Sequence, residues 1–202
     1  MNRCEAPATG SKKSDVSKGR PRNPEVEQRI LTAALQHLRE FGYSRMSIDA
    51  IAAEAGVSKP TIYRRWADKA DLATAALMLL RVAEPALTKG SSKGQLKSAL
   101  HNFRKSLLRP YGFSLIGTVL AEEEHTPTLI ALFRKRIVDP RRQILTSILT
   151  NAKETGEIRA GADLAAAVNM LVGSFYARYL SGEPISTAWV ERIVEVVWCG
   201  IA

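Results

Sequence analysis

Residues 47–66 read SIDAIAAEAGVSKPTIYRRW and contain two short apolar patterns separated by a glycine. In the first pattern, four apolar residues recur at the spacing of one helix face: Ile48, Ile51, Ala52 and Ala55. Ser47 precedes them at the position of a helix N-cap, and Gly56 follows where a left-handed residue can end a helix. The stretch therefore predicts a short helix, a tight turn and a second helix that opens at Ser58.

The second predicted helix, at residues 59–65, has two chemically different faces. Ile62 and Trp66 are four residues apart and are expected to point into the core with the first helix. The outward side chains are basic or carry hydroxyl groups, and a helix N-terminus offers N–H groups to phosphate. Such side chains can also reach base edges in a major groove. This face predicts contact with double-stranded DNA, although a helical hairpin with a solvated basic face has the same periodicity.

The candidate DNA-binding residues combine this face with the starts of the neighbouring helices. Ser47 opens the preceding helix and Lys69 opens the following one, so both are expected to contact the DNA backbone. The predicted set is Ser47, Ser58, Lys59, Thr61, Tyr63, Arg64 and Lys69.

Residues 30–72 resemble the DNA-binding region of the TetR/AcrR family of transcriptional regulators. The resemblance rests on stretches at fixed spacing: ILTAA (30–34), FGY (41–43), SIDAIA (47–52), AGVS (55–58) and TIYRRWADKADL (61–72). The family often has Phe at the position of Trp66, and Tyr or His at the position of Arg65.

The resemblance implies a homodimeric one-component regulator, usually a repressor, whose helix at 59–65 enters the major groove. Binding of a small-molecule effector in the C-terminal domain would change the spacing of the two heads and release a palindromic operator. By position, the resemblance implies groove or phosphate contacts for Thr61 and Tyr63, a phosphate contact for Lys69 and a backbone contact for Ser47.

The chain reads as helical from Pro24 almost to its end, without the alternation that would indicate a strand. The fold class is therefore all-α, with about nine helices. A three-helix helix-turn-helix domain is expected at 24–84, and a helical effector-binding and dimerisation domain at 85–202. The expected helices are 24–41, 47–55, 58–66, 68–89, 92–108, 111–124, 127–155, 163–180 and 186–202, the seventh kinked or broken at Asp139-Pro140.

Residues 1–23 have no hydrophobic period and carry six basic against two acidic side chains. They predict a disordered basic arm. The run Gly19-Arg20-Pro21-Arg22 directly precedes the first helix, where arms of DNA-binding domains reach a minor groove. A solvated leader without contacts is the alternative.

The last two predicted helices carry more apolar surface than two edge helices of a monomer would ordinarily cover. They are therefore the expected homodimer interface, and closure of a monomer core is the alternative. The predicted interface residues are Leu164, Val168, Leu171, Val172, Phe175, Trp189, Ile193 and Val197.

An effector cavity is expected among the middle helices, lined mostly by apolar side chains with a few polar ones. For any single lining residue, plain core packing is the alternative. The predicted lining is Phe103, Leu107, Phe113, Ile116, Leu120, Phe133, Met170 and Ser174.

Charge and cysteine usage narrow the class of protein further. A net charge of +9 favours a polyanionic partner. The two cysteines, Cys4 and Cys199, form neither a disulfide framework nor a metal-ligand spacing. No secretory leader and no apolar run of membrane-spanning length is apparent. The sequence therefore predicts a cytoplasmic protein with no membrane partner.

Catalytic motifs are not evident, so no enzyme activity and no cofactor are expected. The three histidines, His37, His101 and His125, stand in no metalloprotease or triad-like context, and the pair that could share a helix face as a metal site is Glu122 with His125. That pair is read as a solvated acidic helix end in preference to a metal site. A basic protein that coats DNA without sequence preference remains as the alternative to a regulator.

Overall fold

The computed structural model describes residues 23–82 and 90–202, and the structural statements below concern these residues. They are helical and contain no strand, so the all-α prediction is confirmed. The expected basic arm lies outside the described residues apart from Asn23, and so does the expected domain boundary after residue 84.

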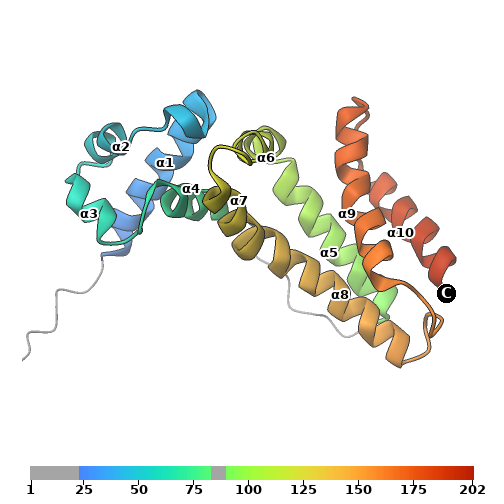
Figure 1. Ribbon diagram of the computed structural model, residues 1–202. Helices are drawn as coiled ribbons and strands as arrows, with labels where there is room; N and C mark the ends of the chain where they lie inside the picture. Colours follow the sequence, from blue (N-terminus) through green and yellow to red (C-terminus); the bar gives the residue numbers. More distant parts are fainter. Residues whose placement is uncertain (1–22, 83–89) are drawn as a thin grey trace, which may run out of the picture.

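Four helices form the N-terminal head: α1 (Pro24–Arg45), α2 (Ile48–Glu54), α3 (Lys59–Tyr63) and α4 (Lys69–Met78) (Figure 1). Side-chain caps begin three of them, because Asn23, Ser47 and Asp68 each accept a hydrogen bond from a backbone N–H two or three residues later. Gly42 has a φ of 72° and interrupts the helical backbone of α1 where the sequence predicts its end.

The remaining helices form the body: α5 (Ser92–Leu107), α6 (Gly112–Leu120), α7 (Pro127–Phe133), η1 (Arg134–Val138), α8 (Asp139–Glu154), α9 (Leu164–Leu180) and α10 (Thr187–Ile201). Figure 1 shows the run from α7 to α8 extending away from α4, with α9 and α10 at the opposite end of the molecule from α2 and α3. Within the described ranges, none of the helices is both long and apolar enough to cross a bilayer.

The predicted kink at Asp139-Pro140 takes a different form. The backbone stays helical through Asp139, and the irregular segment is η1, a π-helical turn that ends at Val138, two residues before Pro140. The N–H of Asp139 donates to the carbonyl of Arg134, five residues earlier. Proline has no N–H to donate to Arg136, so the turn before it widens while the helix continues.

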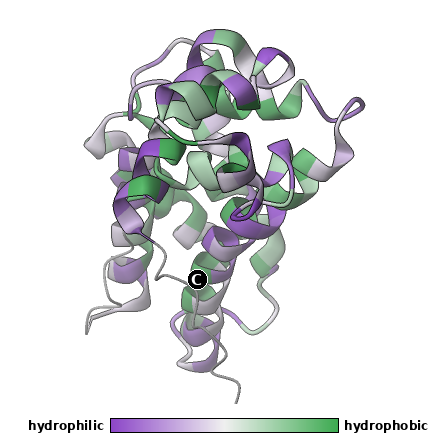
Figure 2. Cartoon of the chain, turned by 90° about the vertical axis from the view of Figure 1, so that its left-hand side faces the viewer, coloured by the Kyte–Doolittle hydropathy of each residue, from purple (hydrophilic) through white to green (hydrophobic). Residues whose placement is uncertain are grey.

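The buried side chains form two hydrophobic clusters that meet at α6. One cluster joins the head helices to α6 and α7, and the other joins α5, α8, α9 and α10. Ile116 packs against both clusters. In Figure 2, hydrophobic and hydrophilic residues alternate along the helices, as expected for helices that each bury one face. The head is therefore continuous with the body through a shared core.

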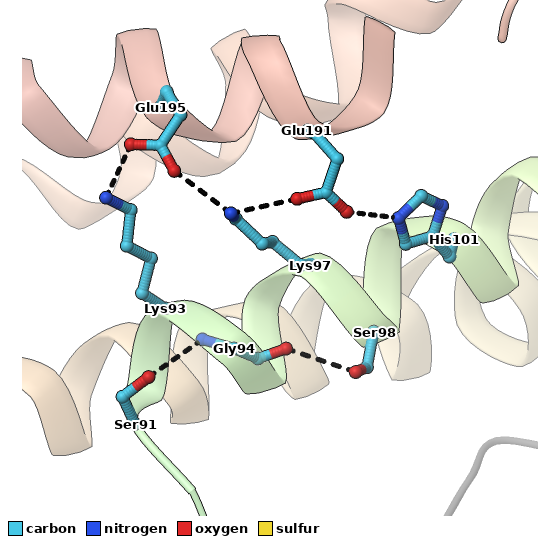
Figure 3. A network of polar contacts seen from close by, with 8 residues as sticks. All are labelled: Ser91, Lys93, Gly94, Lys97, Ser98, His101, Glu191 and Glu195. Carbon is cyan, nitrogen blue, oxygen red and sulfur yellow. Dashed lines mark hydrogen bonds and ion pairs between the residues drawn. The ribbon is translucent and has the colours of Figure 1, made fainter. Parts of the chain in front are cut away.

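Ion pairs fix α10 against α5 on the outside of the second cluster (Figure 3). Lys97 lies between two carboxylates, with its Nζ 2.8 Å from Glu191 Oε2 and 3.0 Å from Glu195 Oε1. Nε2 of His101 lies 2.6 Å from Glu191 Oε1, and Nζ of Lys93 lies 2.5 Å from Glu195 Oε2. These contacts hold the register of the two helices.

Candidate nucleic-acid interface

The α2–turn–α3 unit follows from a few local signals. The Ala50 N–H donates to Ser47 Oγ at the start of α2, and Gly56 has a φ of 64° in the turn. Ile62 on α3 is 1% exposed and belongs to the same buried cluster as Ile51, which is fully buried. Burying such a side chain contributes about 1.5–3 kcal/mol. These contacts fix which side of α3 faces outward.

The outward side of α3 is open to solvent. Tyr63 is 46% exposed, Arg64 and Lys59 are exposed, and Thr61 is partly buried. The predicted split into a core face and a free face thus corresponds to the geometry. Contact of these residues with DNA stays a prediction.

Lys59 and Ser58 already have partners at the start of α3. Lys59 Nζ lies 3.0 Å from Asp49 Oδ2 on α2, and this hydrogen bond raises the pKa of Lys59 above its ordinary value. Ser58 Oγ lies 3.0 Å from Thr61 Oγ1 and makes no bond to the helix backbone. Both pairs are exposed, so a phosphate group can compete for their donors.

Lys69 faces the end of α1. Its Nζ donates to the Ser44 carbonyl at 3.0 Å and lies 4.5 Å from the centroid of the Tyr43 ring. Partial burial lowers the pKa of Lys69. In this geometry the residue links α4 to α1.

Arg65 also packs inward. Its side chain is 11% exposed, and Nη1 lies 3.6 Å from Glu27 Oε2 on α1. Arg136 on η1 forms an ion pair with Asp71 in the first turn of α4. Sequence reasoning did not find this ion pair, because 65 residues separate its members.

A cavity of about 80 Å³ lies where the two hydrophobic clusters meet. Four residues of the expected lining border it: Phe103, Leu107, Ile116 and Phe133. The other four lie elsewhere. Leu120 and Met170 are each 51% exposed, Phe113 stacks on Tyr179, and Ser174 donates to the Leu171 carbonyl within its own helix.

Sequence reasoning missed five polar lining residues: Arg81, Ser106, Arg141, Arg142 and Tyr176. Charged side chains in a helical pattern are ordinarily solvated, so these arginines gave no signal of a cavity. Only the packing of α5, α8, α9 and the segment after α4 brings the five residues together.

The single chain already buries most of the expected dimer residues. Five of them belong to its core: Val168, Leu171, Phe175, Trp189 and Val197. Val172 lines the cavity, and Leu164 and Ile193 are partly buried. The apolar side chains that α9 and α10 leave at the surface are different ones: Met170, Tyr179, Leu180 and Val196. Packing within the single chain therefore buries much of the broad apolar face of these helices, and which residues meet a partner stays a prediction.

The head presents a short helix whose basic and hydroxyl-bearing face is exposed to solvent, and a tight glycine turn joins this helix to α2. This arrangement defines a helix-turn-helix DNA-binding protein.

Two family models together match most of the chain. Residues 30–76 match the bacterial regulatory proteins of the tetR family, and residues 88–197 match the tetracyclin repressor-like C-terminal domain. The chain therefore belongs to the TetR family of transcriptional regulators, and the resemblance seen in the sequence is confirmed.

Relatives and solved structures agree with this assignment. An uncharacterized HTH-type transcriptional regulator of Mycobacterium tuberculosis is 33% identical over 189 residues, which is 91% of this chain and 89% of the relative. A DNA-binding transcriptional repressor TetR of Mycobacteroides abscessus is 30% identical over 172 residues, which is 83% of this chain and 89% of the relative.

The crystal structure of the TetR family transcription regulator SCO0332 superposes with a TM-score of 0.65 at 27% identity, covering 88% of this chain and 99% of that one. FadR from Bacillus subtilis, in complex with stearoyl-CoA, superposes with a TM-score of 0.70 at 22% identity. The match covers 87% of this chain and 100% of that one. The second likeness shows the fold alone.

Proposed function

We propose that this regulator is a dimeric repressor that binds a palindromic operator through α3 and leaves it when a small molecule enters the cavity between the two hydrophobic clusters. The free face of α3 is the observation that carries the DNA-binding half of the proposal. The contacting residues would be Ser47, Ser58, Lys59, Thr61, Tyr63 and Arg64, with Lys69 at the start of α4.

The position of the cavity supports release by an effector. Leu77 at the end of α4 and Phe103 on α5 both line it, so one wall belongs to the head and another to the body. Ligand pockets ordinarily measure about 300–1,000 Å³. Because this cavity is smaller, an effector must move its walls apart, and α4 would move with them. Among solved structures of this fold, FadR was determined with stearoyl-CoA and another protein is described as a flavonoid-responsive regulator.

A dimer is supported by the apolar side chains that α9 and α10 leave exposed. Val196 is 63% exposed and Met170 is 51% exposed on helices whose other faces are buried. Two heads on successive turns of the major groove, about 34 Å apart, would read two half-sites. Joining two weak sites multiplies the affinity of each.

The decisive test is a selection of bound sequences from random duplex DNA, followed by titration against the selected palindrome and a scrambled duplex at several salt concentrations. A regulator should prefer the palindrome by about 10³-fold or more. A preference near unity at every salt concentration would instead show a protein that coats DNA.

A further inference from the structure

The cavity has one apolar and one cationic part. Most of its lining is aliphatic or aromatic, but Arg81, Arg141 and Arg142 also border it, with Ser106 and Tyr176. Among the described residues that line it, none carries a carboxylate. A site of this kind combines apolar contact area with a few directing polar groups, as ligand sites do.

Arg141 borders the cavity and contacts other residues of its lining. It lies in the first turn of α8, and its Nη2 donates to Ser106 Oγ on α5 at 3.3 Å. Its guanidinium carbon lies 4.8 Å from the centroid of the Phe103 ring. Burial raises the pKa of Tyr176, and the nearby charge of Arg141 opposes that shift. The guanidinium therefore lies near lining residues of two other helices, α5 and α9.

The other two arginines differ in position. Arg142 Nη2 donates to Asn169 Oδ1 on α9 at 2.8 Å, which directs that guanidinium toward α9. Arg81 is partly buried near the end of the head helices, and the neighbouring Val82 N–H donates to Ser106 Oγ. Ser106 thus links the segment after α4 to Arg141, so a ligand bound at this end touches both head and body.

We propose that the effector is a small organic anion, with an apolar body against Phe103 and Val172 and an anionic group bound by Arg141 and Arg81. This inference rests on the proposed function in taking the cavity as the effector site. A guanidinium presents N–H donors in a planar fork that fits a carboxylate or phosphate. Charge-assisted bonds in a partly enclosed site are stronger than in water. An uncharged ligand of the same shape lacks this contribution.

The test compares matched probes on the full-length protein by isothermal titration calorimetry. Octanoate, octyl phosphate and octan-1-ol share one chain and differ in the head group, and benzoate with benzyl alcohol repeats the comparison for a ring. At least one anion of each set should bind about tenfold tighter than its alcohol. The stronger of octanoate and octyl phosphate then identifies the anionic group.

Variants assign the selectivity to the cavity. Arg141→Met keeps an apolar stem and should lower the affinity for the preferred anion about tenfold, with that for octan-1-ol changed less than about twofold. Arg141→Lys should recover part of the loss, because the charge remains. Arg81→Met is the second variant if Arg141→Met does not fold. Arg134→Met, an exposed arginine outside the cavity, is the matched control and should bind like the parent.

Alcohols that bind as tightly as the anions would overturn the proposal, and so would a selectivity that survives both methionine variants. Failure of all five probes to bind at millimolar concentration would overturn it too. Operator binding is measured separately on the same samples. Specific operator binding without anion selectivity would refute only the effector class, whereas anion selectivity without any preferred DNA would refute only the regulatory function.

Discussion

Nη1 of Arg136 lies 2.5 Å from Oδ1 of Asp71, and this pair connects η1 to the first turn of α4. The other carboxylate oxygen, Oδ2, accepts the N–H of Ala67 in the loop that follows α3. The adjacent residues of η1, Ile137 and Val138, line the cavity. One short segment therefore borders the cavity and also contacts, through Asp71, the loop that follows α3.

Replacing Arg136 should weaken the hold of Asp71 on the loop that follows α3. Arg136→Gln removes the charge that neutralises a largely buried carboxylate, whose side chain is 16% exposed. We expect a loss of about 1–2 kcal/mol in the free energy of unfolding by urea denaturation, with weaker operator binding. The control is Arg134→Gln, which is on the same segment as Arg136 and breaks an exposed ion pair with Glu123. Its loss in the free energy of unfolding should be below about 0.5 kcal/mol. Equal losses for the two variants would contradict a larger contribution from the buried pair.

Tyr63 and Arg64 should affect operator binding in different ways. Tyr63→Phe removes one uncharged donor and should lower operator affinity about tenfold without changing the salt dependence. Arg64→Gln should also reduce the slope of log affinity against log salt by about 1 if the residue contacts a phosphate. Tyr111→Phe, a similarly exposed tyrosine on the body, is the control. Operator binding by Tyr63→Phe equal to that of the parent would contradict a contact through its hydroxyl group.

The sequence predicted the elements whose signals are local. Asp163 and Ser186 cap α9 and α10 as expected, and Gly56 lies in the predicted turn with a positive φ. A cap or a turn needs only a few neighbouring residues, so periodicity and residue type suffice.

The faces of α9 could not be assigned from the sequence in the same way. This helix is apolar around most of its circumference, and periodicity alone does not say which stripe meets α8 and α10. Val168 and Phe175 pack inside the chain, while Met170 stays outside. The arginines of the cavity could not be predicted from the sequence either. Arg81 and Arg141 are 60 residues apart in the chain, and only folding brings both to the cavity.

The dimer prediction now rests on the exposed sides of α9 and α10. Val196→Arg places a charge on that surface and should shift sedimentation from dimer to monomer, because an unpaired charge in an apolar interface is costly. Helicity should be unchanged, since Val196 is 63% exposed in the single chain. Leu120→Arg, at a residue 51% exposed on α6, is the control and should leave the dimer intact. Persistence of the dimer in Val196→Arg would place the interface elsewhere.

The ion pairs between α5 and α10 predict a stability that depends on pH. Hydrogen bonds from Lys97 and His101 lower the pKa of Glu191, and those from Lys93 and Lys97 lower the pKa of Glu195. A carboxyl group with a lowered pKa in the folded state stabilises the fold above its unfolded pKa of about 4.3, and the contribution disappears as pH falls through the folded value.

The double variant Glu191→Gln and Glu195→Gln should therefore unfold at lower urea than the parent at pH 7, and the gap should narrow as pH falls through the lowered pKa of the two carboxyl groups. Both carboxylates are close to solvent, so 1 M salt should narrow the gap at pH 7 as well. The control is Glu154→Gln, at a carboxylate in the last turn of α8 that is outside this network. A gap that stays constant from pH 7 to pH 3 would show that the glutamates act through packing and not through charge.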